Sequence, residues 1–285
     1  MKVDSFIHGV TSTITSKFSI NNSSNFWNGT GFFYQIMDDK EINGFQKTDE
    51  TYLITNRHML FEKINGKEIL ADKVVFSLKK IIGKWEELRW KKIDLNRDEL
   101  LKRAKIFEDS SIDVVAIRVG DLMIKAIIED HDKNTNYIAF QGITKSHFPK
   151  MNNDYYDVEV GDTILIIGYP HGYFDSVNLY PIVKSGVIAT SLYHNYEGSP
   201  CFLIDAKLFP GSSGSLVISQ PRIPIKIYED GISYYKEKQF EFLGIFSGEP
   251  HQIDAFGNRQ YFDVGKVWFW QLLDLIMAKG ISINK

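Results

Sequence analysis

The chain has 285 residues, of which 44% are hydrophobic, and its formal net charge is −3. A chain of this size can bury a large core, as one large all-β domain or two smaller ones. Acidic and basic residues are interspersed, so no basic block indicates binding to nucleic acid or to an anionic membrane surface. No apolar run approaches the roughly 20 residues that a membrane-spanning helix needs. We therefore expect neither a nucleic-acid nor a membrane partner.

The cysteine content points to a reducing compartment. Cys201 is the single cysteine, so no internal disulfide can form, whereas secreted proteins of this size commonly carry several. The first residues also lack the apolar stretch of a signal peptide. We expect a cytoplasmic protein, with Cys201 as a buried strand residue rather than a nucleophile.

Short runs of aromatic and β-branched residues, separated by Gly, Asn, Asp and Pro, follow one another along the chain, which is typical of β structure. The predicted strands lie near 8–20, 31–37, 51–55, 73–78, 113–119, 163–168, 182–191, 201–205, 215–219 and 240–247. Because helical patterns do not alternate with these strands, a barrel or sandwich is favoured over an α/β fold. The more polar stretches 79–110 and 121–160 are interpreted as insertions between barrel strands.

Three segments have helical features. A short turn is predicted at 56–62 and a short helix at 95–107, and the clearest helix is predicted at 264–279. The last segment has an apolar stripe at spacing four, formed by Val264, Trp268, Leu272 and Ile276. Asp263 is its predicted N-cap and Gly280 its predicted stop.

A serine in a glycine-flanked turn is the strongest functional signal. Ser213 lies in the sequence Pro-Gly-Ser-Ser-Gly-Ser, and two possible partners precede it, His58 after one predicted strand and Asp113 at the start of another. A serine hydroxyl needs a base within hydrogen-bond reach, and histidine titrates near neutrality. A carboxylate holds the imidazole in the correct tautomer. The order His, Asp, Ser therefore predicts a catalytic triad.

The same turn offers donors for the negative charge of a tetrahedral intermediate. The backbone N–H groups of Gly211 and Ser213 are the predicted oxyanion hole, and Gly211 suits a strained turn because it has no Cβ. His171 and His194 lie in loops without a second ligand at metal-site spacing, so we expect no metal and no cofactor.

At these residues the chain resembles the chymotrypsin-fold (trypsin-like) serine peptidases, and specifically their bacterial HtrA-type branch. The stretches that carry the resemblance are Gly-Thr-Gly-Phe-Phe at 29–33, Leu-Ile-Thr-Asn-Arg-His at 53–58, 167–170 with 184–188, 205–215, and Gly-Ile-Phe-Ser-Gly at 244–248. The resemblance as a whole spans about residues 8–279.

The resemblance implies an all-β fold of two six-stranded antiparallel β-barrels, at about 8–130 and 155–262, with a C-terminal α-helix at about 264–279. The active site would lie between the barrels. The chain near Ser247 would pair with an extended substrate as an added strand. The fold would then bind a protein or peptide and cleave it through an acyl-enzyme intermediate.

Some positions depart from the family pattern. Ser212 replaces the aspartate that pairs with a new N-terminus in digestive members, so that activation route is not expected. Phe246 stands where glutamyl endopeptidases have a histidine, which argues against glutamate specificity. No sequence remains after the final helix for a PDZ module, so we expect this domain to be lacking.

The resemblance also implies where substrate side chains bind. Lys207, six residues before the nucleophile, and Glu249 would line the specificity pocket together with Ser247 and Gly248. If the opposite charges of Lys207 and Glu249 pair, the pocket is nearly neutral and simple trypsin-like preference is disfavoured.

Two functions stay open at this point. The first is a serine endopeptidase, restrained by narrow specificity, by a disordered oxyanion turn, or by a regulatory protein partner on the insertions 79–110 or 121–160. Such an enzyme would suit a bacterial stress or defence pathway. The second is a catalytically silent trypsin-like fold that binds a protein or peptide.

Overall fold

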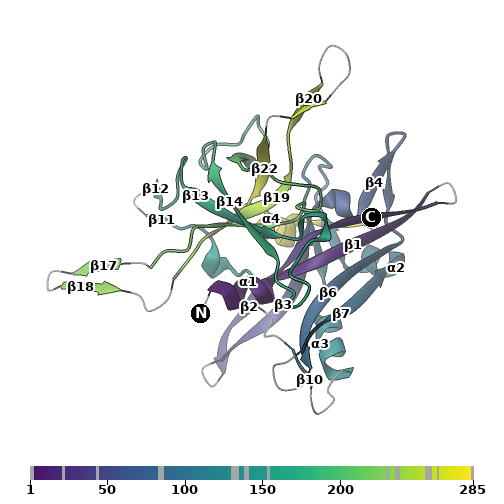
Figure 1. Ribbon diagram of the computed structural model, residues 1–285, viewed down its shortest axis with the longest axis horizontal. Helices are drawn as coiled ribbons and strands as arrows, with labels where there is room; N and C mark the ends of the chain where they lie inside the picture. The colour runs from purple at the N-terminus through teal and green to yellow at the C-terminus, as the bar shows by residue number, and fades with distance from the viewer. Residues whose placement is uncertain are drawn as a thin grey trace.

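The computed structural model of the chain describes residues 3–20, 23–42, 45–82, 87–129, 135–137, 141–152, 155–223, 225–228, 231–234, 238–253, 259–261 and 263–283. Most of the described residues form antiparallel strands, and Figure 1 shows two β units packed side by side. The helices are α1 (Val3–Val10), α2 (Arg97–Arg103), α3 (Gly120–Glu129) and α4 (Gln271–Lys279), and the short 3-10 turns are η1 (Arg57–Met59), η2 (Lys145–His147) and η3 (Pro170–Gly172).

The C-terminal unit is a closed six-stranded barrel. Its strands are β13 (Thr163–Gly168), β14 (Ile182–Ile188), β15 (Cys201–Asp205), β16 (Leu216–Ser219), β19 (Phe242–Gly248) and β22 (Val264–Phe269), joined in the order β13-β14-β15-β22-β19-β16. The barrel and the helix α4 that follows it confirm the predicted β fold with a C-terminal helix.

The N-terminal unit is one sheet of nine strands in the described residues, so it has more strands than the six predicted. These are β1 (Thr11–Ile20), β2 (Ser23–Ile42), β3 (Phe45–Thr55), β6 (Lys73–Ile82), β7 (Glu87–Asn96), β8 (Ala104–Ile106), β9 (Val115–Arg118), β10 (Thr135–Tyr137) and β23 (Ile281–Ser282). The order is β10-β6-β1-β2-β3-β9-β8-β23, with β7 paired to β6. The long β6–β7 hairpin and the contribution of β23 from the end of the chain enlarge the sheet.

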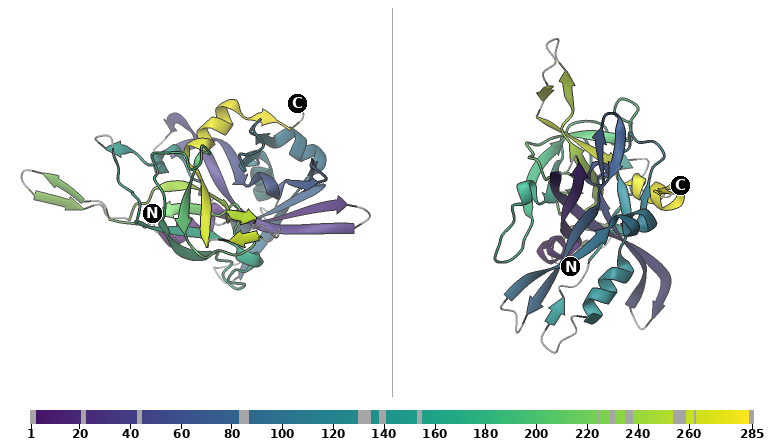
Figure 2. Two further views of the ribbon diagram at one scale, coloured as in Figure 1. Left: turned by 90° about the horizontal axis from the view of Figure 1, so that it is seen from above. Right: turned by 90° about the vertical axis from the view of Figure 1, so that its right-hand side faces the viewer.

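Four two-stranded hairpins complete the described strands: β4 (Phe61–Ile64) with β5 (Lys67–Leu70), β11 (Met151–Asn152) with β12 (Tyr155–Tyr156), β17 (Ile225–Tyr228) with β18 (Gly231–Tyr234), and β20 (His251–Ile253) with β21 (Arg259–Tyr261). Figure 2 shows the β17–β18 hairpin and the far end of the β1–β2 hairpin projecting from the body on opposite sides.

Residues 29–34 of β2, 51–55 of β3 and 115–117 of β9 are buried on both faces of the sheet, where the two units meet. Neighbouring side chains on these strands alternate between two cores. One core, inside the N-terminal sheet, includes Phe33, Leu53 and Ile117. The adjoining core, which fills the barrel, includes Phe32, Ile54 and Ala116. The ends of β3 and β9 therefore face the barrel.

The predicted helix at 264–279 is wrong in its first part. Residues 264–269 form β22, which pairs with β15 and β19, and the helix begins at Gln271 with Trp270 as its N-cap residue. The apolar run Val-Trp-Phe-Trp fits a strand buried on both faces as well as a helix. Gly280 is the C-cap, as predicted, and its N–H donates to the carbonyl of Ile276 at 2.9 Å.

Other differences are local. Residues 8–10, predicted as strand, belong to α1, and α3 lies in a stretch expected to be an insertion. The helix predicted within 95–107 is α2, where Asn96 and Glu99 form a reciprocal capping box. None of the helices in the described part of the chain has the length and apolar character needed to cross a lipid bilayer.

Candidate active site

His58 lies on the turn η1, directly after β3. The turn is fixed by its neighbour Arg57, whose buried guanidinium makes a forked ion pair with Glu68 at 3.1 and 2.7 Å. The same guanidinium donates to the carbonyl of Phe107 at 3.0 Å. Bidentate pairs of this kind fix direction as well as position. Sequence reasoning missed this ion pair, because residues 57 and 68 belong to different elements.

Asp113 comes into reach of His58 because β3 and β9 pair in register. Thr55 lies opposite Val115, so the residues just outside the two strands are neighbours. The side chain of Asn56 donates to the carbonyl of Asp113 at 2.8 Å and ties the two chain segments together. The convergence of positions 58 and 113 therefore follows from the register of two strands.

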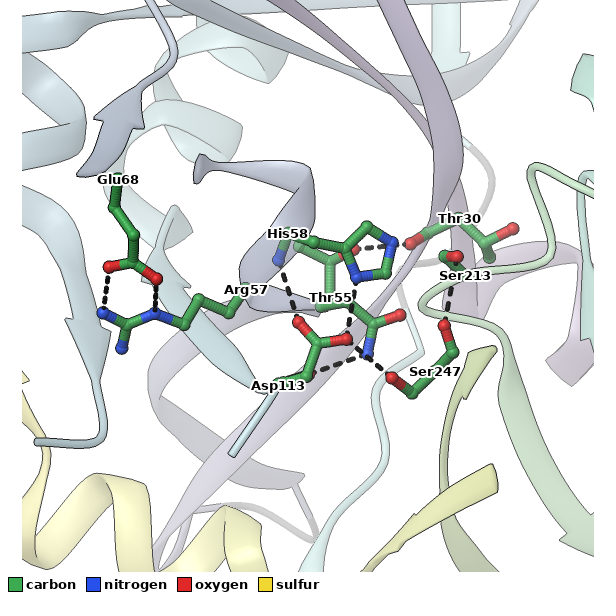
Figure 3. Close-up of polar contacts among 9 residues, drawn as sticks. Thr30, Thr55, Arg57, His58, Glu68, Asp113, Ser213 and Ser247 are labelled. Carbon is green, nitrogen blue, oxygen red and sulfur yellow. Dashed lines mark hydrogen bonds and ion pairs between the residues drawn. The ribbon is translucent and has the colours of Figure 1, made fainter. Parts of the chain in front are cut away.

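The carboxylate of Asp113 accepts three hydrogen bonds. The backbone N–H of His58 donates to Oδ1 at 2.8 Å, and Nδ1 of the imidazole lies 2.7 Å from Oδ2. The hydroxyl of Ser247 donates to Oδ2 at 2.6 Å (Figure 3). A carboxylate oxygen facing Nδ1 accepts a hydrogen bond from the ring, which fixes the tautomer with the proton on Nδ1. The lone pair of Nε2 is then available as a base.

Ser213 lies in a turn that only glycine can flank. Gly211 has φ +88° and Gly214 has φ +81°. A Cβ on Gly214 would lie 2.0 Å from the carbonyl oxygen of Thr30, and one on Gly211 would lie 2.6 Å from the backbone nitrogen of His171. Both the left-handed backbone and the close approach therefore exclude a side chain at these positions.

The Ser213 hydroxyl donates to the carbonyl of Ser247 at 3.3 Å, and the structure shows no hydrogen bond between this hydroxyl and His58. Ser247 thus links the two sides of the site, because its own hydroxyl contacts Asp113 (Figure 3). His58, Asp113 and Ser213 are therefore brought into one cluster, with Ser213 attached through Ser247. His58 and Ser213 are both partly exposed, so the cluster is open to solvent on one side.

Thr30 joins the N-terminal sheet to the nucleophile turn. Its N–H donates to the carbonyl of Ser213 at 2.8 Å, and its hydroxyl donates to the carbonyl of Gly211 at 3.2 Å. Its hydroxyl also accepts from the N–H of Tyr169 at 2.9 Å, and its carbonyl accepts from the hydroxyl of Thr55 at 2.8 Å. This role was missed at the sequence level, where 29–33 was matched only as a motif.

The amides predicted to stabilise an oxyanion have no other acceptor. Among the hydrogen bonds of the described residues, the N–H groups of Ser212, Gly214 and Ser215 are all occupied. Within the same described part of the chain, the N–H groups of Gly211 and Ser213 donate to no protein atom. Two free donors in one turn are the feature that an oxyanion hole requires.

A cavity of about 260 Å³ opens beside the nucleophile. It is lined by Leu208, Phe209, Pro210, Ser213, Phe246, Gly248 and Glu249. Gly248 and Glu249 thus line a cavity that also reaches Ser213. Lys207 is exposed, between the buried residues Ala206 and Leu208, and it is not among the residues that line the cavity.

The predicted pairing of Lys207 with Glu249 is not found among the described ion pairs. The backbone carbonyl of Lys207 instead accepts a hydrogen bond from the ammonium group of Lys184. Glu249 is thus the one charged side chain among the cavity-lining residues that the structure describes.

The backbone of residues 247–249 has an open edge. On the side of β19 that faces β16, pairing ends at Phe246, whose N–H donates to Ser215 at 3.0 Å and whose carbonyl accepts from Gly214 at 2.9 Å. On the other side, Gly248 still pairs with Lys266 of β22. An extended peptide could add to the open side as a strand.

The chain was compared with protein families, curated sequences and solved structures. A sequence profile of a family described as "Trypsin-like peptidase domain" matches residues 29–221, which is more than half of the chain and includes positions 58, 113 and 213. Among solved structures, the active form of the Rv3671c protease from M. tuberculosis is similar, with 15% sequence identity and a TM-score of 0.44. That match covers 96% of this chain and 81% of the other. No curated protein sequence matches the chain.

Proposed function

The chain belongs to the trypsin-like peptidase family, and on that premise we propose that it is a serine endopeptidase with His58, Asp113 and Ser213 as its catalytic residues. The observation that carries this proposal is the His58–Asp113 contact of 2.7 Å beside a serine in a strained glycine turn. A fully hydrogen-bonded carboxylate behind an accessible imidazole is the arrangement that a base needs.

In the proposed reaction, Nε2 of His58 takes the proton of the Ser213 hydroxyl as Oγ attacks the scissile carbonyl. The ionised Asp113 stabilises the imidazolium that forms, and His58 then gives the proton to the leaving amine. The acyl group stays on Ser213 until water, deprotonated by His58, releases it. For this reaction, the hydroxyl of Ser213 must turn from the carbonyl of Ser247 toward Nε2.

The free N–H groups of Gly211 and Ser213 would hold the oxyanion of each tetrahedral intermediate. Such donors are effective because they are already oriented when charge develops, and the loss of one costs about 10²–10³-fold in turnover. The hydroxyl of Thr30, which holds the carbonyl of Gly211, supports this orientation.

We propose that the substrate lies along the open edge at Ser247, Gly248 and Glu249, with one side chain in the cavity of about 260 Å³. The walls of that cavity are mostly apolar, and its one described charge is the carboxylate of Glu249. Because Lys207 does not line the cavity, we expect apolar or basic side chains to be preferred to acidic ones. A peptide library cleaved by the wild type and by Lys207→Ala should give the same profile, whereas Glu249→Gln should reduce cleavage after basic residues.

A fluorophosphonate probe tests the proposed function directly. We expect covalent labelling of Ser213 in the folded protein, no labelling of Ser213→Ala, and strongly slowed labelling of His58→Ala. Mass spectrometry of the labelled peptide identifies the site. Labelling that persists in Ser213→Ala, or that is absent from folded wild type at a high probe concentration, would contradict the proposal.

One observation favours the second candidate, a catalytically silent fold that binds a polypeptide. The Ser213 hydroxyl is engaged by the carbonyl of Ser247 and is not bonded to His58. If this orientation persists when a peptide is bound, the serine is not activated. In that case the protein binds peptides at the open edge of β19 but neither cleaves them nor reacts with the probe.

We also propose that an active enzyme is restrained in a bacterial cytoplasm, by narrow specificity or by a protein partner on 79–110 or 121–160, as in a stress or defence pathway. Support comes from α3, within the second stretch, which exposes Ile124 and Ile128 to solvent at 60% and 67%. Exposed apolar side chains on one helix suit a protein contact. Rapid, unselective digestion of casein by the purified chain would contradict this restraint.

A further inference from the structure

A second groove adjoins the nucleophile turn and shares no lining residue with the cavity at Glu249. It has a volume of about 780 Å³. Its floor is one face of the four neighbouring strands β2, β1, β6 and β7, and its wall is the segment from Tyr169 to Phe174 after β13. The β6–β7 hairpin supplies two of the four strands of this floor.

The groove begins at the nucleophile turn. Gly29, at one end, is so close to that turn that a Cβ on it would lie 3.3 Å from the carbonyl oxygen of Ser213. His171, on the wall, donates its backbone N–H to the carbonyl of Pro210 at 2.7 Å. The cavity at Glu249 and this groove therefore both adjoin the turn that carries Ser213.

The side chains along the groove have a net positive character. Lys73 is paired with Asp94, which leaves these two nearly neutral. Lys92 is exposed on β7, opposite Ser77, and among the described residues no ion pair or hydrogen bond involves its ammonium group. An exposed cation on a groove floor, without a carboxylate partner of its own, attracts an anionic side chain.

The inner end of the groove is aromatic. The ring of Trp90 meets that of Tyr169 edge-on at 6.1 Å and that of Phe174 at 5.7 Å. The buried ammonium of Lys79 lies 5.4 Å from the Trp90 ring centre, in a cation–π contact. Because Trp90 and Lys92 lie on the same face of β7, a bound chain meets both.

We propose that this groove binds the part of a polypeptide substrate that follows the scissile bond, and that Lys92 selects an acidic side chain there. The assignment rests on the proposed endopeptidase function. The acyl side of the substrate is accounted for by the open edge at 247–249, so the leaving side must cross Gly29. The groove is the continuation of that path, and Lys92 is its unpaired charge.

The test varies only the leaving side. All peptides have the same sequence before the cleaved bond, and each residue after that bond is changed in turn to Glu, Ala or Lys. At one position we expect kcat/KM to be about tenfold higher for Glu than for Lys, since attraction is exchanged for repulsion at a partly exposed site. The preference should weaken as sodium chloride is added.

Charge reversal at the groove should reverse the preference. Lys92→Glu should favour the Lys peptide, and Lys92→Gln should give nearly equal rates. The matched control is Lys125→Glu on α3, which changes the net charge equally at an exposed position outside the groove and should keep the wild-type ratio. A chromogenic substrate without residues after the cleaved bond should be cleaved equally by all four proteins. If Lys92→Glu keeps the wild-type preference, the groove assignment is overturned.

A binding experiment separates this proposal from the proposed function. Fluorescence anisotropy with labelled Glu and Lys peptides is measured on Ser213→Ala and on Ser213→Ala with Lys92→Glu, and fluorophosphonate labelling is scored on wild type. Labelling of the wild type without any preference for the Glu peptide would contradict the proposed role of the groove and would still support the endopeptidase function. A Glu preference in binding that depends on Lys92, without labelling, supports the groove as a peptide site while the endopeptidase fails.

Discussion

The two sides of the candidate site are held in different ways. On the N-terminal side, His58 and Asp113 are fixed by polar side chains: the carboxylate accepts three hydrogen bonds, and the turn of His58 is tied down by Arg57. On the C-terminal side, the turn of Ser213 is fixed by backbone contacts and by two glycines with positive φ.

This difference indicates how each side should fail. Removal of a polar side chain near Asp113 leaves the surrounding strands intact, so the rate should suffer more than the fold. Addition of a single methyl group in the serine turn forces backbones apart, so both the stability of the fold and the catalytic rate should decrease.

Asp113→Asn should have the largest effect on rate and little effect on stability. The amide can donate to Nδ1 and so stabilise the wrong tautomer of His58, which leaves Nε2 protonated. We expect kcat to fall by about 10⁴-fold, as in the Ser-His-Asp template. Steady-state kinetics with a cleaved peptide measures this, and thermal unfolding controls for the fold. A decrease of less than tenfold would remove Asp113 from the mechanism.

Gly214→Ala should act mainly by lowering the free energy of unfolding, and any loss of activity should follow from the loss of folded protein. Its Cβ would meet the carbonyl of Thr30 at 2.0 Å and the hydroxyl of Thr55 at 2.6 Å. We expect a loss of about 3 kcal/mol in the free energy of unfolding, measured in urea. Gly161→Ala is the matched control, because Gly161 also has positive φ (+93°) but nothing lies within 4 Å of its Cβ position. Gly161→Ala should lower the free energy of unfolding by about 1 kcal/mol. If both variants lost the same amount, the positive φ alone would account for the loss and the close contact with Thr30 would not contribute.

Lys79→Met should change the pH dependence of stability in the N-terminal unit. Burial lowers the pKa of Lys79 from 10.5 to about 7, so above pH 7 the unfolded chain binds more protons than the folded one. The free energy of unfolding of the wild type should therefore rise with pH from 7 toward 10.5. Burial and the charge of Lys79 lower the pKa of the adjacent His8 to about 4, so His8 stays neutral over this range.

The measurement is the thermal midpoint at pH 7, 8 and 9 for wild type and Lys79→Met. We expect a rise for the wild type and a flatter profile for the variant, which keeps the volume of the side chain without its charge. Parallel profiles would mean that Lys79 is not the group that titrates.

Ser247→Ala should have the smallest effect. It removes one of the three hydrogen bonds to Asp113 but keeps the backbone carbonyl that contacts Ser213. A hydrogen bond to a charged group contributes about 1.5–3 kcal/mol, and the exposed site allows water to replace part of it, so we expect kcat to fall about tenfold. Ser176→Ala, in an exposed loop, should have no effect. An unchanged rate for Ser247→Ala would mean that His58 alone holds the carboxylate in place.

Much of the barrel could be predicted from sequence because its strands are short apolar runs between turn residues. The strands at 163–168 and 201–205 coincide with β13 and β15. The segment 264–269 could not be assigned in this way, since a strand buried on both faces has no alternation to distinguish it from a buried helix. Helix α3 was not predicted, because the polar composition of residues 121–160 indicated an insertion, and the helical spacing of the apolar residues within that stretch was not considered.

The candidate site shows a similar division. His58, Asp113 and Ser213 were predicted from residue type, order and motif, whereas their geometry depends on the register of β3 with β9. The contacts of Thr30, Asn56 and Arg57 were not predicted, because each joins segments that are separate in the sequence. Lys207 was placed by its distance from Ser213 along the chain, but in the structure it is exposed and does not line the cavity.

The four hydrogen bonds of Thr30 have a consequence for any change of shape. They connect strand β2 to the turn at 211–213, to Tyr169 and to Thr55 with no water between. A hinge that swings the two β units apart would break most of them at once, so the site cannot open by a rigid-body movement at small cost. Gradual denaturation should accordingly abolish probe labelling and tertiary structure at the same urea concentration, as one cooperative event.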